Sequence, residues 1–151
     1  MFIYILIIQE AIFEYDRASK LNPTDSRICS NKSHCLMKLG KIKEAEEEMN
    51  LAIEMNPNDS FYFFNRGNLN IELENFEEAL KDFNSAIELN SNDSEYFSKK
   101  ADTLCFLEEF KSSIEFHKIS IKMSPMNPDY HFNLGNVCCK IYLFIFYIKK
   151  I

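Results

Sequence analysis

Apolar, small and polar residues recur along this chain with a period of 34 residues. Two series of alanine and one of leucine carry the period most clearly, and Ser or Ile continues them into further units. The polar connections repeat as well, reading NPTDS at 22–26, NPNDS at 56–60 and NSNDS at 90–94. A fixed period of this length is typical of a protein built from one repeated supersecondary unit. The series are Ala11, Ala45 and Ala79; Ala18, Ala52 and Ala86; and Leu39, Leu73 and Leu107.

Each unit predicts two helices joined by a short turn. We number its positions from the residues Ser26, Ser60, Ser94 and Pro128, which stand at position 1. Helix A is expected over about positions 2–15 and helix B over about positions 18–31. Asp or Ser in the connection can cap the next helix A, and proline at position 32 ends helix B because it lacks the amide that a continuing helix needs. Small residues at positions 8, 20 and 27 allow close helix contact, and the pairs must stack because one pair cannot bury its apolar face alone.

The period divides the chain into five segments. Residues 26–59, 60–93 and 94–127 are complete units, residues 1–25 hold helix B of a first unit with a truncated helix A, and residues 128–151 hold helix A of a fifth with an apolar tail. Both ends are apolar where a solenoid normally has polar caps. Two hypotheses stay open for residues 1–8 and 141–151: translated non-coding or misjoined sequence, since A and T alone can encode nearly all of these residues, or apolar extensions of the terminal helices that pack or dimerise.

Residues 64–90, FNRGNLNIELENFEEALKDFNSAIELN, resemble a tetratricopeptide repeat. The pattern of that family is W-x2-L-G-x2-Y, then A-x3-F, then P. The resemblance extends over about residues 5–141 and implies a right-handed, all-α solenoid of stacked antiparallel helix pairs. The fourth unit departs most, with Ser113 and His117 in place of Ala and Phe, so looser packing is expected there. Position 7 is basic in three units instead of the usual Leu. The matching residues of the third unit are Phe63, Arg66, Gly67, Asn70, Ala79, Phe83, Ala86 and Ser91.

Composition and charge narrow the class of protein. Hydrophobic residues make up 46% and charged residues 26% of the chain, which is typical of a globular protein. The net charge of −6 argues against a nucleic-acid partner, which would normally need a basic surface. Five cysteines without a CxxC motif indicate reduced thiols in a cytosolic or nuclear compartment, and of these two a cytoplasmic location is expected. Neither apolar end reaches the roughly 20 residues that span a bilayer.

Catalytic motifs are absent from the sequence, which contains no P-loop, GxGxxG, GxSxG or HExxH. Cys29, His34 and Cys35 have spacings that do not converge on one ion along a helix. The carboxylate-rich stretches have helical spacing with Lys nearby, as on a solvated face. We therefore expect no catalytic residue, no cofactor and no metal, and a protein that is not an enzyme.

A ladder of polar residues along the A helices is the candidate binding surface. Positions 2, 5, 6, 9, 12 and 13 share one helix face, which lines the concave side of stacked pairs. Position 6 is Asn in three units, and an Asn amide can pair with a peptide backbone whatever the side chains of the partner. In a chain this rich in Asn, the alternative is that Asn simply suits this position. Lys99 and Asp102 interrupt the series and are expected to set specificity. The expected groove residues are Asn31, His34, Asn65, Asn68, Lys99, Asp102, Asn133 and Asn136, with Arg27, Phe61 and Phe64.

The sequence argues against the carboxylate clamp that some members of this family use to hold chaperone C-termini. Only Asn65 and Lys99 match the clamp, and Glu95 would repel a carboxylate. A partner segment with apolar anchors and a few acidic residues is expected instead.

Three interpretations of function follow. The leading one is a protein–protein interaction scaffold that binds an extended peptide in the concave groove. The second is the regulatory or substrate-recognition arm of a larger enzyme, of the glycosyltransferase, phosphatase or hydroxylase type, whose catalytic domain lies outside this chain. The third is self-association through the apolar ends.

Overall fold

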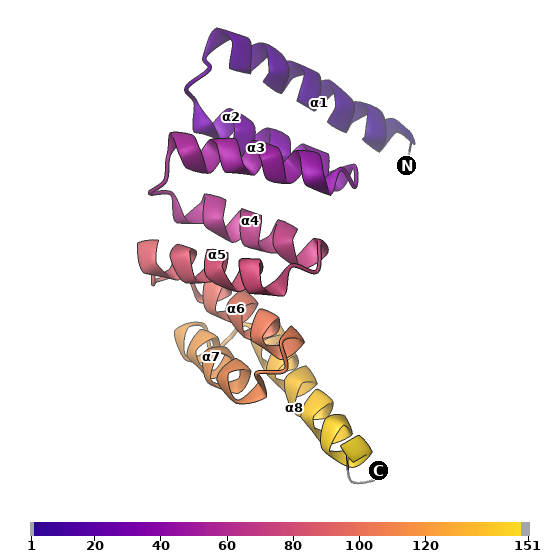
Figure 1. The fold of residues 1–151 in the computed structure, drawn as a ribbon, viewed down its shortest axis with the longest axis vertical. Coiled ribbons are helices and arrows are strands. Elements are labelled where there is room, and N and C mark those ends of the chain that lie inside the picture. The colour runs from indigo at the N-terminus through magenta and orange to yellow at the C-terminus, as the bar shows by residue number, and fades with distance from the viewer. Residues whose placement is uncertain (1, 149–151) are drawn as a thin grey trace. The chain divides into compact units, whose positions relative to one another are not determined.

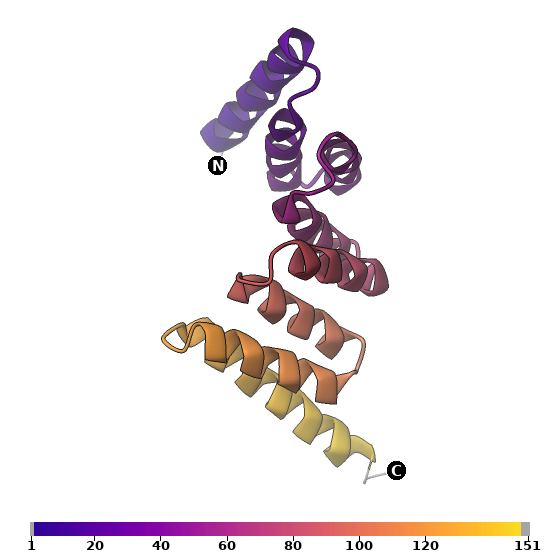
Figure 2. The ribbon, with the colours of Figure 1, turned by 90° about the vertical axis from the view of Figure 1, so that its left-hand side faces the viewer.

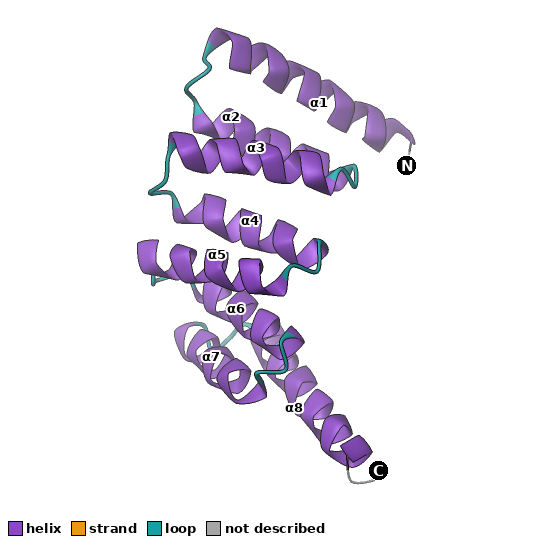
Figure 3. Cartoon of the chain, viewed as in Figure 1, coloured by secondary structure: helices purple, strands orange, loops and turns teal. Residues whose placement is uncertain are grey.

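The computed structural model describes residues 2–148, and the side chains of residues 2–146. Eight helices and no strands make up this part of the chain, and short loops join them (Figure 3). The helices are α1 (Phe2–Leu21), α2 (Ser26–Lys38), α3 (Ile42–Met55), α4 (Ser60–Glu72), α5 (Phe76–Leu89), α6 (Ser94–Phe106), α7 (Phe110–Met123) and α8 (Pro128–Ile148). The predicted all-α fold is confirmed, and helices α2 to α7 lie within two residues of the expected bounds.

The chain divides into two compact structural units, Met1–Asn75 and Phe76–Ile151. From here on, "first unit" and "second unit" mean these two parts of the structure, and the 34-residue segments of the sequence are called repeats. In the first unit α1 packs on α2, α2 on α3 and α3 on α4; in the second, α5 packs on α6, α6 on α7 and α7 on α8. Consecutive helices within each unit run antiparallel (Figures 1 and 2). The division falls after Asn75, within the predicted segment 60–93, so α4 and α5 belong to different units.

Aspartate caps three of the A helices, as the connections predict. Asp25, Asp59 and Asp93 precede α2, α4 and α6, and each side chain accepts a hydrogen bond from the backbone N–H two residues later. This satisfies one of the amides that a helix N-terminus leaves without an intrahelical partner.

The same three helices end in one shared conformation. The residue at position 15 has a positive φ in each case: 74° at Gly40, 59° at Glu74 and 62° at Glu108. The N–H groups that follow each helix turn back to its last carbonyls, as in the bond from Glu109 N to Leu104 O at 2.9 Å. Only Gly40 is suited to this region of backbone space, because a Cβ atom makes it unfavourable for the two glutamates.

The small residues of the repeat lie where helix A meets helix B. In the first unit Ser33 Oγ of α2 donates to Ala45 O of α3 at 2.6 Å, and in the second Ser113 Oγ of α7 donates to Ala101 O of α6 at 2.8 Å. Both bonds join positions 8 and 20, although the serine stands on opposite helices in the two pairs. A direct hydrogen bond from a short side chain to the facing backbone requires the close approach that small residues permit.

Burial does not distinguish the fourth repeat from the others. Ser113, His117 and Ser120 are fully buried, like Ala45 and Met49 at corresponding positions, so the expected looser packing is not visible as exposure. The difference is one of polarity. The serine hydroxyls donate to backbone carbonyls, whereas neither ring nitrogen of His117 makes a hydrogen bond; Nε2 lies 3.3 Å from Asp102 Oδ1.

The basic residues at position 7 hold neighbouring helices together. Lys32 Nζ of α2 lies 2.7 Å from Asp16 Oδ1 of α1 and 2.7 Å from Glu48 Oε1 of α3. Burial acts to lower the pKa of Lys32, but the hydrogen bonds from the two carboxylates outweigh it, and the pKa is raised. Lys100 instead lies over the ring of Phe116, with Nζ 3.9 Å from the centroid, and burial lowers its pKa. The basic residues that stand at position 7 in place of the usual leucine therefore make ionic and cation–π contacts instead of an apolar contact.

Changing Glu108 to Gly should raise the free energy of unfolding by about 1 kcal/mol, because it removes a Cβ atom from a positive-φ position. Urea denaturation of the 151-residue chain measures this. The matched control is Gly40→Ala, which places a Cβ atom at the same position of another repeat and should lower the free energy by a similar amount. Equal stabilities for Glu108→Gly and the original chain would contradict the interpretation.

His117→Met should also stabilise the chain, by about 1 kcal/mol, because it removes two buried nitrogens that lack hydrogen bonds. Methionine already stands at this position as Met49. The reverse change, Met49→His, should be destabilising. Thermal unfolding followed by circular dichroism distinguishes the two outcomes. A loss of stability in His117→Met would show that the approach of His117 to Asp102 is worth more than the desolvation of the ring costs.

Candidate functional site

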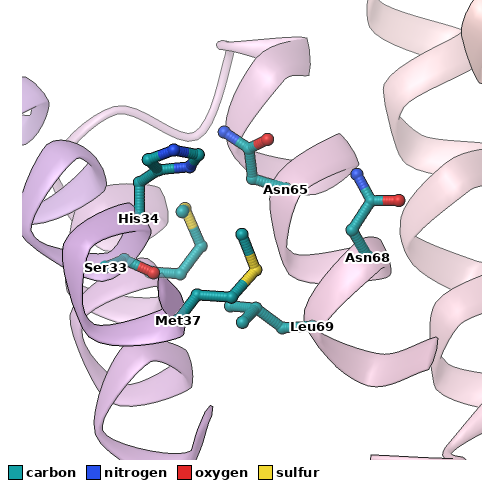
Figure 4. A pocket seen from close by; sticks show the side chains of 7 residues that line it. Ser33, His34, Met37, Asn65, Asn68 and Leu69 are labelled. Carbon is teal, nitrogen blue, oxygen red and sulfur yellow. The ribbon is translucent and has the colours of Figure 1, made fainter. Parts of the chain in front are cut away.

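A small pocket opens between α2, α3 and α4 in the first unit (Figure 4). Its volume is about 160 Å³, comparable with the ~150 Å³ apolar cavity that accepts a benzene-sized molecule. His34 comes from α2, and Asn65 and Asn68 come from α4, so three residues of the predicted ladder meet here. The full lining is Ser33, His34, Met37, Met49, Asn65, Asn68 and Leu69.

The side chains that line this pocket are mainly apolar, and two of them carry amide groups. Met37, Met49 and Leu69 supply apolar surface, and the two thioethers are polarizable and adapt to the shape of a guest. Asn65 and Asn68 each offer a donor and an acceptor beside that surface. None of the described residues that line the pocket carries a carboxylate or an ammonium group. The arrangement suits an apolar side chain whose adjoining peptide group pairs with an amide.

A wider depression of about 540 Å³ lies between α6 and α8 in the second unit. Lys99 and Asp102 of α6 and Asn133 of α8 border it, so three further ladder residues meet here. The exposed ring of Phe132 forms part of its wall. The full lining is Glu95, Ser98, Lys99, Asp102, Asn127, Asp129, Tyr130, Phe132 and Asn133.

The second depression has an excess of acidic groups. Glu95, Asp102 and Asp129 line it together with Lys99, whose ammonium group is the one basic group among the described lining residues. Asp102 also approaches the buried ring of His117 at 3.3 Å. Because opposite charges attract most strongly where solvent is partly excluded, this surface favours a cationic group. Positions 6 and 9 of an A helix therefore line both pockets, with two amides in the first unit and with Lys99 and Asp102 in the second.

The remaining predicted groove residues lie outside both pockets. Arg27, Asn31, Phe61 and Asn136 are exposed on their helices. The guanidinium group of Arg27 is held by the capping residue Asp25, with Nη2 2.6 Å from Oδ2. This pairing lowers the pKa of Asp25 and raises that of Arg27. The charge of Arg27 is therefore already paired within the chain.

Phe64, which was expected to line the groove, is buried and offers little surface to a partner. Phe64 is only 7% exposed, whereas Phe132 at the same repeat position is 68% exposed. Position 5 is also buried at Ser30 and Ser98. Position 5 therefore points into the packing in α2, α4 and α6, and it is open only in α8.

Several pocket residues were not among the predicted groove residues. Met37 stands at position 12 and Asp129 at position 2. Both positions lie on the helix face that was assigned to the groove, so that assignment could have identified the two residues. Met49 lies on helix B, and Leu69 and Tyr130 stand at positions 10 and 3. No periodicity argument marks these three, because their role depends on how neighbouring helices pack.

Residues 2–146 contain no group of three or more His, Cys, Asp or Glu side chains that could hold a metal ion. No helix in the described part of the chain is long and apolar enough to cross a membrane. Burial raises the pKa of the thiols of Cys29, Cys35 and Cys105. These three thiols are therefore protonated at neutral pH and are weak nucleophiles.

Two family models, both described as tetratricopeptide repeat, match the sequence at residues 8–63 and 60–93. Comparison with curated proteins found no match. The structure resembles MamA from Desulfovibrio magneticus RS-1 with a TM-score of 0.82 at 16% identity, covering 88% of this chain and 75% of that one.

Two TPR domains of known structure are similar as well. The first TPR of Spaghetti (RPAP3), bound to the HSP90 peptide SRMEEVD, has a TM-score of 0.74 at 19% identity, with coverage of 78% of this chain and 94% of that one. The Arabidopsis OM64 TPR domain has a TM-score of 0.73 at 17% identity, with coverage of 77% and 96%. At these identities the likeness shows a shared fold, the all-α solenoid of helix pairs.

Proposed function

The chain belongs to the tetratricopeptide repeat family, and from this premise we propose that it is a protein-interaction scaffold whose A helices hold an extended segment of a partner. The observation that carries the proposal is the pocket of the first unit, where His34, Asn65 and Asn68 surround an apolar interior. Such a site recognises a side chain and a peptide group together. The protein then acts by binding, without catalysis of its own, in the cytoplasm.

The first unit is suited to an apolar anchor residue. A pocket of about 160 Å³ has room for one branched or thioether side chain rather than for a whole ligand. Burial of such a side chain provides most of the affinity. The amides of Asn65 and Asn68 would fix the direction of the peptide, because they pair with a backbone carbonyl and N–H whatever the sequence.

The second unit is suited to a basic segment of the partner. Its depression has three carboxylates and one ammonium group, and Phe132 provides an exposed aromatic face on which an Arg or Lys side chain can lie. The earlier expectation of acidic partner residues does not suit this surface. A partner segment that combines an apolar anchor with basic residues suits the two units better.

The HSP90 peptide in the complex of the first TPR of Spaghetti (RPAP3) is acidic. Glu95 borders the depression of the second unit and would repel such a peptide. We therefore propose that this chain does not use a carboxylate clamp.

Asn65→Ala should weaken the binding of selected peptides by about tenfold, since loss of one hydrogen bond in a partly buried site costs on the order of 1.4 kcal/mol. Peptides are selected by display on the 151-residue chain, and affinities are then measured by fluorescence anisotropy. The matched control is Asn58→Ala, the same change at an exposed turn residue away from both pockets. If both variants bind like the original chain, the first-unit pocket is not the binding site.

SRMEEVD should bind about tenfold more weakly than a version in which both glutamates are lysine, because of the carboxylates of the second unit. Glu95→Lys should reduce or reverse this preference, whereas Glu46→Lys, on α3 outside both pockets, should leave it unchanged. Isothermal titration of both peptides against the three proteins measures the effect. Tighter binding of SRMEEVD by the original chain would contradict the proposal.

A further inference from the structure

Among the described residues of their own units, α1 and α8 each have no partner helix of the kind that their repeat positions have elsewhere in the chain. α1 occupies helix B positions of a first repeat, and α8 occupies helix A positions of a fifth. The complete pairs α2/α3 and α6/α7 show which residues such a partner covers. At positions 8 and 20 the two helices are joined by the hydrogen bonds from Ser33 to Ala45 and from Ser113 to Ala101.

The surface of α8 that would face a helix B is open. Gly135 stands at position 8, and a Cβ atom built on it would meet nothing within 4 Å. Its counterparts Ser33 and Ala101 are 1% and 0% exposed. Cys138, at position 11, is exposed, while Leu36 and Leu104 at that position are buried. α8 therefore has a helix A contact surface without its helix B.

The surface of α1 that would face a helix A is uncovered in the same way. Ala11, Tyr15 and Ala18 stand at positions 20, 24 and 27 and are partly exposed. Their counterparts in α3 and α7 are fully or almost fully buried. α1 packs on α2 within its unit, and Figure 1 shows no other helix of the first unit against the opposite side of α1.

The two surfaces belong to complementary halves of one repeat. α8 carries the helix A positions of a repeat as far as position 14, which is Ile141. α1 carries the positions of a repeat from position 14, which is Ile5, onward. In complete repeats helix B begins at Ile42, Phe76 or Phe110, which correspond to Ile8 in α1. α1 extends beyond that point by residues 2–7, and α8 extends beyond the usual end of helix A by residues 141–148.

These two extensions explain the apolar ends. In an antiparallel pair, residues that follow the end of helix A lie beside residues that precede the start of helix B. The extension of α8 would therefore lie along the extension of α1 if the two helices paired. Both are rich in exposed apolar side chains, with Phe2, Ile3 and Ile7 on one and Tyr142, Leu143 and Phe146 on the other. Pairing of the two helices would bury the apolar side chains of both extensions together.

We propose that α8 of one copy of this chain packs on α1 of a second copy and completes a tetratricopeptide repeat between them. The contact places Gly135 of one copy against Ala11 of the next, as Ala101 lies against Ser113 within the chain. It is heterologous, since each copy uses one surface at α8 and a different one at α1. Such contacts form rings or open chains of copies.

Two variants test the proposal. Gly135→Arg has room in the single chain, because no atom lies near the new Cβ, and Ala11→Arg alters the opposite surface. Multi-angle light scattering with size-exclusion chromatography should show assemblies of the original chain that grow with concentration. Each variant should be monomeric, with association weakened at least about tenfold by a buried charge in the contact. Asn58→Arg, at an exposed turn residue, is the control and should assemble normally.

Mixing the two variants gives the sharper result. The Ala11→Arg chain keeps an intact α8 and the Gly135→Arg chain keeps an intact α1, so an equimolar mixture should form a dimer and stop there. Circular dichroism melting checks that each variant is folded before mixing.

Three outcomes would overturn the proposal. The original chain could remain monomeric at all concentrations. Gly135→Arg could assemble like the original chain, which would mean that the apolar ends cluster without repeat pairing. Finally, Ala11→Arg could still self-associate while Gly135→Arg does not, which would indicate symmetric pairing of two α8 helices.

Discussion

The close contact between helix A and helix B is the constraint on which the rest of this structure depends. An antiparallel pair of amphipathic helices buries its apolar surface only if the backbones approach closely and further pairs cover the outer faces. Ser33 and Ala45 make that approach in one unit, and Ala101 and Ser113 make it in the other, each through a hydrogen bond from a hydroxyl to a facing carbonyl. Larger side chains such as Met49 then fill the space beside the contact.

Contacts between successive A helices repeat in the same way. Ser26 Oγ and Tyr62 OH are 3.0 Å apart in the first unit, and Ser94 Oγ and Tyr130 OH are 3.0 Å apart in the second. Both pairs join position 1 of one repeat to position 3 of the next. Because each repeat contacts only its neighbours, such bonds set the spacing of the A helices locally. The candidate binding surface therefore inherits its geometry from the repeat and its chemistry from individual side chains.

The difference between the two units illustrates this separation. Positions 6 and 9 are Asn65 and Asn68 in α4 but Lys99 and Asp102 in α6. The first pair lies beside methionine and leucine side chains, and the second lies among further carboxylates. A single helix geometry thus presents an amide-lined apolar pocket in one unit and an acidic depression in the other. Specificity in repeat proteins depends on such substitutions on a constant framework.

Much of the fold could be predicted from the sequence because its determinants are local. The helix starts follow from capping residues such as Asp59, and the helix lengths follow from the 34-residue period. The position numbers also place Asn65 and Asn68 on one helix face, and both residues line the pocket of the first unit. Each of these features depends on residues within one helix or one turn.

The accessibility of each position was decided only by tertiary packing. Phe64 and Phe132 have the same repeat position, yet neighbouring structure leaves the first buried and the second exposed. Likewise, the sequence shows a basic residue at position 7, but only the structure shows that Lys32 is held between Asp16 and Glu48 on two other helices. The sequence by itself determined the repeat, its helices and its polar ladder. The packed structure decided which side chains remain open to a partner, because burial depends on residues that are distant along the chain.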